Sequence, residues 1–398
     1  MIQPVPRATY RFFQAVTNDL SQAGVLPSAG TAGCRQLTDS CQPQVQTRFA
    51  SALTAAPQLP ISEQTTIIAG VSGGVDSMLM LAYLLHLRQQ VPFQLAAAHL
   101  NHGLRGSAAD RDQAVVEEFC RAQQVICHVR QTDVSSLAKA RGQGVEEAGR
   151  AARFAFFQDL GTQTQLEFQQ DYLVALAHHE QDQAETILLN LGRGSGLSGL
   201  TGMAILRGRL LRPFLHRSKA EIEAAARAAG IPWAVDQTNL EPDYRRNRLR
   251  NELLPLWQEI VGSDLTPQLA RLAQNLREEV IALETAAAEL YQRALLPDGT
   301  LSTKVLRRAP QAVSARALNL GLNEAVRRHL DNSTTLSETA LPKKLQDQLW
   351  LLCWADTAAL NTLDLQKGIK AEVYANTLRF SFDGSFDGRS NTDFDSVL

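Results

Sequence analysis

Short apolar runs alternate with longer amphipathic segments over residues 65–260 of the chain. The short runs are bounded by glycine or polar residues, which predicts buried strands, and the segments between them have apolar residues at helical spacing. Such alternation is typical of an α/β fold with a doubly wound parallel sheet. Strands are expected at Ile67–Val71, Gln94–His99, Ile126–Arg130, Tyr172–Ala177 and near Arg209–Arg212, and helices at Val75–Arg88, Arg111–Gln123, Gly144–Gly161, Gln181–Leu191 and Lys219–Ala229.

Residues 1–64 have a different pattern, rich in Ser, Thr, Gln, Ala and Pro and poor in charge. Within them, Ala8–Ala23 is expected to form a helix because its large apolar side chains fall on one face. Gly24–Gln64 is expected to be a loop or linker. We predict a partly disordered N-terminal extension, with an organellar transit segment as the alternative for this Ser-rich, acid-poor end. The apolar face consists of Phe12, Phe13, Val16 and Leu20.

From Thr266 onward the apolar spacing is mainly helical, and a small hairpin is expected near the end of the chain. The chain is therefore predicted to have three parts: the extension at 1–64, the α/β domain at 65–262 and a helical C-terminal domain at 263–398. The expected C-terminal elements are helices near Val313–His329 and Lys343–Leu352 and a hairpin of Lys370–Val373 and Leu378–Phe382 around Asn376.

The composition is that of a globular protein without a membrane span. Apolar residues make up 44% of the 398 residues, charged residues 20%, and the formal net charge is −2. No apolar run reaches the roughly 18 residues that a membrane helix needs. The five cysteines are scattered and never spaced as C-x-x-C, which favours reduced thiols over a metal cluster. We expect a cytoplasmic protein whose basic surface, if present, is local.

The run from Val71 to Ser77 follows a predicted strand and opens a predicted helix. This arrangement directs backbone N–H groups and the positive end of a helix dipole at an anion. The two glycines let phosphate approach closely, the two serines add hydroxyl donors, and Asp76 can hold a divalent cation. The loop is not of the Walker A type, because no Lys-Ser/Thr pair follows the glycines. It predicts a nucleotide phosphate site, with an ordinary tight turn as the alternative.

Polar side chains also follow two further strands at their carboxyl ends. Such ends meet at one edge of a parallel sheet, so we expect these side chains to border the same cleft as the loop. Asp182 and Glu185 are three residues apart on one helix face and offer the oxygen ligands that Mg²⁺ prefers. Alternatively, they only offset the helix dipole. The two groups are His99, Asn101, His102 and Arg105, and His178, His179, Asp182 and Glu185.

Arginines occur in two later segments. Arg193 lies in a glycine-rich stretch that suits either phosphate contact or a flexible linker. Four more fall within Arg245–Arg250, near Trp233 and Tyr244, where they could grip an RNA backbone while an aromatic ring stacks on a base. A solvated helix face with local ion pairs explains the same residues equally well. The acids available for such pairs are Glu241, Asp243 and Glu252.

Taken together, these segments resemble the tRNA(Ile)-lysidine synthetase family of PP-loop ATP pyrophosphatases over roughly residues 65–260. The family's pattern runs SGGxDS, HxNHxLR, an ARxxRY-like helix, HHxxDQAET, RGSGxxGLxGM and a DxTN…RNxxR stretch. Gly149 and Phe154 replace the commoner Ala and Tyr, and the segment around Glu167–Asp171 is longer. The matching segments here are Ser72–Ser77, His99–Arg105, Gly149–Phe154, His178–Thr186, Arg193–Met203 and Asp236–Arg250.

The resemblance implies a two-step reaction on the wobble cytidine of the tRNA(Ile) that carries a CAU anticodon. ATP, with Mg²⁺, adenylates O2 of the base and releases pyrophosphate. The ε-amino group of L-lysine then attacks C2 and expels AMP. The C-terminal domain would contact the tRNA, and a homodimer is left open.

The resemblance also implies a role for individual residues. Asp76, His178, Asp182 and Glu185 would be catalytic, with Asp76 and Asp182 as ligands of Mg²⁺. ATP would be bound by Ser72, Gly73, Gly74, Val75, Asp76, Ser77, Ala98, His99, Arg150 and Arg153. The tRNA would be bound by Arg105, Arg193, Arg245, Arg246, Arg248 and Arg250.

Other functions fit parts of the same sequence. A PP-loop tRNA thiolase also adenylates a base, but it needs paired cysteines or a cysteine-held cluster, and Cys120 and Cys127 are not expected at the cleft. Another PP-loop enzyme that adenylates a small carboxylate or nucleotide fits less well, because the arginine clusters favour RNA. An RNA-binding module with an inactive nucleotide site would be expected to lack Asp76 or the pair Asp182 and Glu185, and all three are present.

Overall fold

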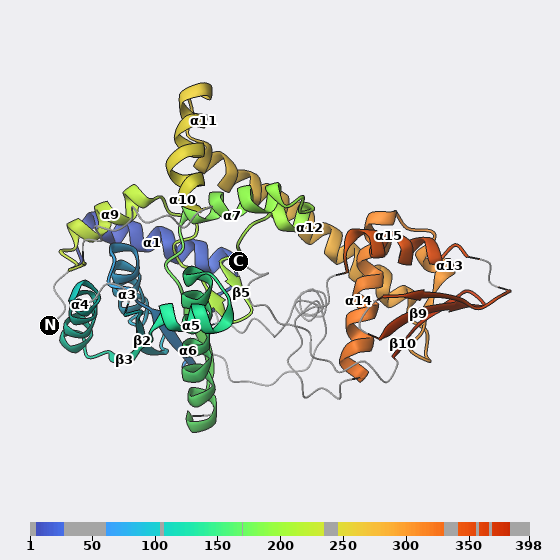
Figure 1. Cartoon of the computed structure of the whole chain (residues 1–398), viewed down its shortest axis with the longest axis horizontal. Helices are drawn as coiled ribbons and strands as arrows, with labels where there is room; N and C mark the ends of the chain where they lie inside the picture. The colour runs from blue at the N-terminus through green and yellow to red at the C-terminus, as the bar shows by residue number, and fades with distance from the viewer. Residues whose placement is uncertain are drawn as a thin grey trace, which may run out of the picture. The chain divides into compact units, whose positions relative to one another are not determined.

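The chain folds into two compact units, divided at Leu276. The computed structural model describes residues 5–27, 61–103, 107–168, 170–234, 246–329, 341–355, 358–365 and 368–382 (Figure 1). Most of the first unit has the predicted α/β pattern, and the second combines helices with a small sheet. In the described part of the chain, no helix combines the length and apolar character needed to cross a membrane.

The first unit is built on a six-stranded sheet in the order β3-β2-β1-β4-β6-β5. Neighbouring strands are parallel except β5 and β6, which form a short antiparallel hairpin at one edge. This confirms the predicted doubly wound parallel sheet. The strands are β1 (Thr65–Gly70), β2 (Gln94–Asn101), β3 (Ile126–Gln131), β4 (Asp171–Ala175), β5 (Leu206–Arg207) and β6 (Leu210–Leu211).

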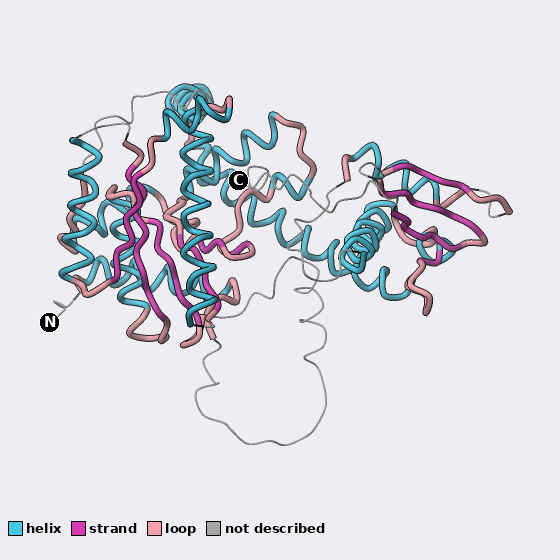
Figure 2. Tube along the Cα trace, turned by 60° about the horizontal axis from the view of Figure 1, so that its bottom comes forward, coloured by secondary structure: helices cyan, strands magenta, loops and turns pink. Residues whose placement is uncertain are grey.

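Helices lie on both faces of this sheet (Figure 2). The helices predicted between strands are confirmed to within a few residues, apart from α6, which continues seven positions further than expected, to Phe168. The short helix α5 was not predicted; Asp133 caps its start and Gly142 ends it in a left-handed conformation. The helices of this unit are α1 (Arg7–Gln22), α3 (Val75–Leu87), α4 (Ser107–Ala122), α5 (Val134–Arg141), α6 (Val145–Phe168), α7 (Glu180–Gly192), α8 (Leu197–Leu200), α9 (Lys219–Ala228), α10 (Arg246–Arg248), the π-helical turn η1 (Leu249–Leu253), α11 (Leu254–Val261) and the first part of α12 (Leu265–Ala294).

The strand order reverses at β1, which lies between β2 and β4. The chain therefore leaves the carboxyl ends of β1 and β4 in opposite directions, and a crevice opens between the two connections. The first connection is the glycine-rich loop that leads into α3. The second is the segment from Leu176 to His179 that leads into α7. The fold thus brings together two motifs that lie about 100 residues apart in the sequence.

Helix α1 confirms the helix predicted at Ala8–Ala23, and all four residues of its apolar face are buried. Phe12 packs edge-on against Phe214, with ring centroids 5.2 Å apart, and Phe13 packs similarly against Tyr83 at 5.3 Å. The helix is thereby part of the core of the first unit. Most of the predicted linker, residues 28–60, lies outside the described residues.

The second unit contains a four-stranded antiparallel sheet in the order β7-β10-β9-β8. The predicted hairpin is confirmed as β9 and β10, and Ala375 and Asn376 at its turn both have positive φ angles. The two outer strands were not predicted, since each is only two to four residues long. The elements are α13 (Thr303–Leu306), α14 (Gln311–His329), α15 (Lys343–Leu352), β7 (Leu301–Ser302), β8 (Asn361–Asp364), β9 (Ile369–Tyr374) and β10 (Thr377–Phe382), with the remainder of α12.

Candidate active site

The glycine-rich loop between β1 and α3 is closed by its own serines. Ser77 Oγ donates to the carbonyl oxygen of Gly74 (3.0 Å) and accepts from the backbone N–H of Ser72 (3.1 Å). Gly73 has a φ of +94°, and the backbone oxygen of Asp112 lies 3.2 Å from where a Cβ would be. Gly74 is the N-cap of α3 and has no side chain to bond the first backbone N–H groups of the helix. These N–H groups are therefore available to an anion.

The end of β2 is tied to this loop. His99 is buried, and its Nδ1 lies 2.8 Å from the carbonyl oxygen of Val71. Because a carbonyl oxygen only accepts, Nδ1 carries the proton, and burial lowers the pKa of His99, which keeps the ring neutral. The N–H of Val71 donates to the carbonyl oxygen of Ala98 (2.9 Å). Ala98 and His99 thus contact the backbone where the loop begins.

Asn101, the last residue of β2, and His102, which follows it, contact helices α4 and α6. Asn101 Nδ2 donates to Asp110 Oδ1 (3.2 Å) and to Gln113 Oε1 (3.1 Å), both on α4. Arg153, on α6, lies with Nη2 3.2 Å from His102 Nε2. Since a guanidinium only donates, this imidazole nitrogen accepts. Helix α6 thus brings Arg153 to His102, the residue that directly follows β2.

The start of α7 is a capping box built by His179 and Asp182. The backbone N–H of His179 donates to Asp182 Oδ2 (2.9 Å), and His179 Nδ1 accepts from the N–H of Gln181 (3.3 Å). Burial would raise the pKa of Asp182, but the electrostatic interactions with His179 and Arg250 and the hydrogen bond from the backbone of His179 lower it below its usual value. Asp182 is therefore an ionised carboxylate with one oxygen fixed by the helix start.

Arg250 joins the two carboxylates that the sequence singled out. Its Nε donates to Glu185 Oε1 (2.8 Å), and its Nη2 lies 2.7 Å from the same oxygen and 3.3 Å from Asp182 Oδ1. Glu185 is 2% exposed, and this burial raises its pKa despite the neighbouring guanidinium. Arg250 extends from η1, and π-helical turns frequently occur at functional sites. The result is a compact anionic pair held by one cation.

His178 lies beside this pair among several arginines. Burial and the positive charges of Arg212, Arg246 and Arg150 lower its pKa to about 3, although Asp182 acts in the opposite direction. Its Nδ1 is buried and has no hydrogen-bond partner within the described parts of the chain. His178 is therefore a neutral imidazole that can accept or donate a hydrogen bond to a substrate.

We expect His178→Gln to make the protein less sensitive to acid. A histidine in the unfolded chain titrates near pH 6.5, whereas folded His178 stays neutral to about pH 3. Below pH 6.5 the unfolded state therefore binds the proton preferentially, and this group costs up to about 1.4 kcal/mol of unfolding free energy per pH unit. Urea unfolding at pH 7 and pH 5 measures the effect. The wild type should lose more stability than the variant on acidification, and equal losses would contradict the assignment.

Lys219 is a site residue that no sequence motif identified. It is the first residue of α9, and its Nζ lies 2.7 Å from both carboxylate oxygens of Asp76. The two residues are 143 positions apart, so no local pattern links them. Asp76, in the first turn of α3, thus has a full positive charge beside it.

The remaining predicted residues are less central or lie elsewhere. Arg150 stacks on Phe154, with its guanidinium carbon 5.4 Å from the ring centroid. Arg248 is exposed and donates to Glu252 (2.9 Å), one of the acids available for local ion pairs. Arg193 is the exposed C-cap of α7. Arg105 and Arg245 lie outside the described residues, as do Asp236–Asn239.

The glycine-rich stretch that follows Arg193 is fixed to α7. The buried side chain of Gln183 donates to the carbonyl oxygen of Met203 (3.0 Å) and accepts from its N–H (2.7 Å). Gly202 has a φ of +60°, and a Cβ there would lie 2.5 Å from Gln183 Oε1. Asn190 also donates to the carbonyl oxygen of Gly199 (2.8 Å). This segment is therefore packed against the site helix and is not a free linker.

The donor set at the loop suits Mg²⁺ bound together with phosphate. Within the described ranges, no three His, Cys, Asp or Glu side chains group closely enough to hold a metal alone. Nucleotide-bound Mg²⁺ usually takes only one or two protein carboxylates, with phosphate oxygens and water as its other ligands. Asp76 offers such a carboxylate beside the anion site, and its pairing with Lys219 shows that it is placed to bind a cation.

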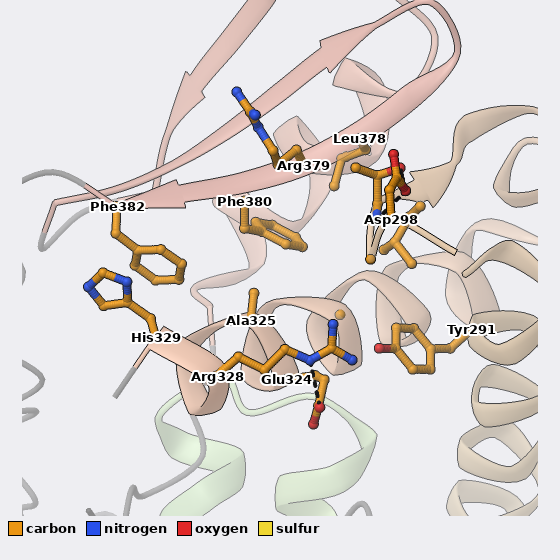
Figure 3. A pocket seen from close by; sticks show the side chains of 14 residues that line it. Tyr291, Asp298, Glu324, Ala325, Arg328, His329, Leu378, Arg379, Phe380 and Phe382 are labelled. Atoms are coloured by element: carbon orange, nitrogen blue, oxygen red, sulfur yellow. Dashed lines mark hydrogen bonds and ion pairs between the residues drawn. The ribbon is translucent and has the colours of Figure 1, made fainter. Parts of the chain in front are cut away.

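A separate cavity of about 350 Å³ lies wholly within the second unit (Figure 3). Phe380 points into it from β10, and His329 stacks on Phe382 with ring centroids 4.2 Å apart. Its arginines are paired with acids, as Arg328 with Glu324 at 3.0 Å. This pairing gives the cavity little excess positive charge. None of the predicted site residues lines it.

The first unit, with a phosphate-binding loop and a carboxylate pair at the switch point of a parallel sheet, is a nucleotide-binding domain. The PP-loop domain family matches residues 41–257, more than half of the chain, so the chain belongs to this ATP-binding class. The chain is 32% identical over 330 residues to the tRNA(Ile)-lysidine synthase of Geobacillus kaustophilus, covering 81% of this chain and 68% of that protein. It belongs to the tRNA(Ile)-lysidine synthase family, which confirms the resemblance found in the motifs.

A second curated relative agrees on the class. The chain is 34% identical over 274 residues to the tRNA(Ile)-lysidine synthase of Clostridium tetani, covering 65% of this chain and 58% of that protein. It therefore spans about 58% to 68% of the length of these two curated relatives. Among solved structures, a U34-tRNA thiolase from Methanococcus maripaludis is similar at 16% identity with a TM-score of 0.43, covering 59% of this chain and 79% of that one.

Proposed function

We propose that this protein converts the wobble cytidine of a CAU-anticodon tRNA(Ile) to lysidine, consuming ATP and L-lysine. The observation that carries the proposal is the joint placement of an anion-binding loop and a carboxylate pair bridged by Arg250 at the switch point of one sheet. An adenylating ligase needs both a phosphate site and a site for the incoming amine. The family membership supplies the identity of the substrates.

In the first step, O2 of the cytidine attacks the α-phosphorus of ATP, and the bond to the β-phosphate oxygen breaks with release of pyrophosphate. The backbone N–H groups at the start of α3 would bind the phosphates, since this helix end carries no side-chain cap. Arg153 and Arg150, both on α6, would face the α-phosphate from the other side. Asp76 would hold Mg²⁺, which stabilises negative charge on the departing pyrophosphate.

In the second step, the ε-amino nitrogen of lysine forms a bond to C2, and the bond from C2 to the adenylated oxygen breaks to release AMP. The ammonium of free lysine must first lose a proton. Glu185 is the candidate base, because burial raises its pKa and it lies beside Asp182. Asp182, held ionised, would bind the amine before attack. Neutral His178 would orient the cytosine ring of the tRNA through a hydrogen bond.

The tRNA would approach along the arginines near this site. Arg246, on α10, is near enough to His178 and Glu185 for its charge to lower the pKa of both, and we propose that it contacts the nucleotide being modified. Arg193 and Arg248 are exposed and would contact the RNA backbone further out. The C-terminal unit is proposed as a further tRNA contact, and a homodimer as the assembly.

The decisive experiment is incorporation of labelled L-lysine into unmodified tRNA(Ile) carrying a CAU anticodon, with ATP and Mg²⁺. We expect label in the RNA, and none when the wobble cytidine is replaced by uridine. A transcript of the initiator methionine tRNA, which has the same anticodon, is the matched control. ATP cleavage to AMP and pyrophosphate without labelled RNA would show the PP-loop chemistry and exclude lysine as the acceptor.

The thiolase alternative is disfavoured by the positions of Cys120 and Cys127. Cys127 is the second residue of β3, at the amino end of an edge strand, and buried Cys120 lies in the last turns of α4 beside it. The candidate site is at the carboxyl ends of the strands, whereas these thiols lie near the amino end of β3. Neither is placed to carry sulfur to an adenylated base.

A further inference from the structure

We propose that Lys219 is a ligand of the nucleotide phosphates. Its ammonium neutralises Asp76 when no nucleotide is bound, and it contacts the β- and γ-phosphate oxygens when ATP occupies the loop. This inference rests on the proposed use of ATP at this site and adds a residue that lies outside the motifs quoted above. It is carried by four observations: the position of the ammonium, the composition of the loop, the place of Lys219 in its helix and the bracing of its backbone.

The first observation is position. Asp76 follows Gly74, the N-cap of α3, by two residues, so its carboxylate borders the anion site. Lys219 Nζ lies 2.7 Å from each oxygen of this carboxylate. Only the Asp76 carboxylate therefore separates the ammonium from the backbone N–H groups proposed to bind phosphate. The Lys219 side chain is 37% exposed and that of Asp76 is 26% exposed. The ammonium can therefore reach an arriving nucleotide by rotation about its flexible stem.

The second observation is what the loop lacks. Between Val71 and Ser77 there is no lysine or arginine, so the loop offers a triphosphate only backbone dipoles and hydroxyl groups. Phosphate loops of the Walker type contain a lysine that reaches the β- and γ-phosphates. Here α9, a distant part of the chain, brings Lys219 next to the loop at Asp76. A full positive charge beside the loop is the element that the local sequence omits.

The third observation is the unfavourable place that Lys219 occupies. It is the first residue of α9, where the positive end of the helix dipole favours acidic side chains. The cap of this helix is complete without it, because Ser218 and Glu221 form a capping box. Lys219 is therefore not needed to cap the helix. The positive end of the helix dipole disfavours its ammonium at this position unless an anion lies beside it. Asp76 is that anion in this structure, and phosphate would replace it.

The fourth observation is that the backbone before Lys219 is braced from two sides. The carbonyl oxygen of Arg217 accepts from the N–H of Glu180, the first residue of α7 (3.0 Å). The guanidinium of Arg217 donates to Asp19 on α1 (2.5 Å). A fixed backbone with a long, mobile side chain suits a residue that exchanges one anionic partner for another.

The test is ATP binding by the full chain, measured by titration calorimetry without tRNA or lysine, once with EDTA and once with Mg²⁺. Lys219→Ala is compared with the wild type, with Lys219→Arg, and with Lys139→Ala, which removes an exposed lysine on α5. We expect Lys219→Ala to weaken ATP binding by about 10- to 100-fold in both conditions, as for loss of a charge-assisted contact. Lys219→Arg should recover much of the affinity, and Lys139→Ala should bind as the wild type does.

The opposite result would overturn the proposal. If Lys219 only occupies Asp76, removing it frees the carboxylate, and Lys219→Ala would bind ATP with Mg²⁺ as tightly as the wild type or more tightly. Thermal melting of each variant checks the fold, and if Lys219→Ala melts early, Lys219→Gln replaces it. Because binding is measured without tRNA and lysine, a protein that binds ATP through Lys219 but makes no lysidine would refute the proposed function alone.

Discussion

Asp76→Ala should abolish formation of the adenylate while leaving the protein folded. The carboxylate lies beside the anion site and is the proposed protein ligand of Mg²⁺, so its loss removes charge stabilisation from the departing pyrophosphate. We expect a decrease on the order of 10³-fold in pyrophosphate release with saturating ATP and tRNA. The unfolding free energy should change by less than about 1 kcal/mol, since a partly exposed ion pair contributes little.

A matched control is Asp171→Ala. Asp171 is the exposed first residue of β4, at the amino end of the strand, where it pairs with Arg209 at 3.3 Å. That variant loses a carboxylate from the same domain but at the amino ends of the strands, and it should release pyrophosphate at the wild-type rate. Pyrophosphate release by Asp76→Ala at a rate near that of the control would exclude Asp76 from the phosphate and metal site.

The second large effect is expected for Glu185→Gln, which should separate the two steps of the reaction. The substitution keeps the shape of the side chain and a hydrogen-bond acceptor for Arg250, but it removes the buried carboxylate proposed to take a proton from lysine. Transfer of lysine should fall by about 10²- to 10⁴-fold. Adenylation should continue, so that tRNA bearing AMP accumulates when labelled ATP is supplied.

Glu252→Gln provides the control for that experiment, because Glu252 is also paired with an arginine, Arg248, but on an exposed helix face. It should transfer lysine at nearly the wild-type rate. If Glu185→Gln lost adenylation and lysine transfer to the same extent, Glu185 would belong to the first step, and the proton acceptor would have to be sought elsewhere.

The elements of the α/β unit could be predicted from the sequence because its strands are short apolar runs, whereas its helices are longer segments with apolar residues at helical spacing. The sequence also predicted which strand ends carry the site, because the motifs after β1, β2 and β4 are contiguous in the chain. It did not predict Lys219, since only the packing of α9 against α3 brings this residue to Asp76. Nothing in the composition around Lys219 distinguishes it from a solvent-exposed lysine at a helix start.

Arg250 shows a different limit of sequence reasoning. Its neighbours along the chain place it in a predicted RNA-binding patch, whereas its side chain contacts Asp182 and Glu185. Arg246 and Arg250 are four residues apart and so share a helix face, which is a signal that separates them from Arg248. The contact of Arg250 with α7, however, depends on how η1 packs against that helix, and no local pattern determines that packing.

Helix α1 has a consequence for how this family is compared across species. It lies outside the segment that matches the PP-loop domain family, which begins at residue 41, yet its aromatic side chains cover Tyr83 and Phe214 inside that segment. Relatives without an equivalent helix must cover these two positions in another way or carry smaller, more polar residues there. Positions 83 and 214 should therefore covary with the presence of the helix, and alignments trimmed to the matched segment would discard that signal.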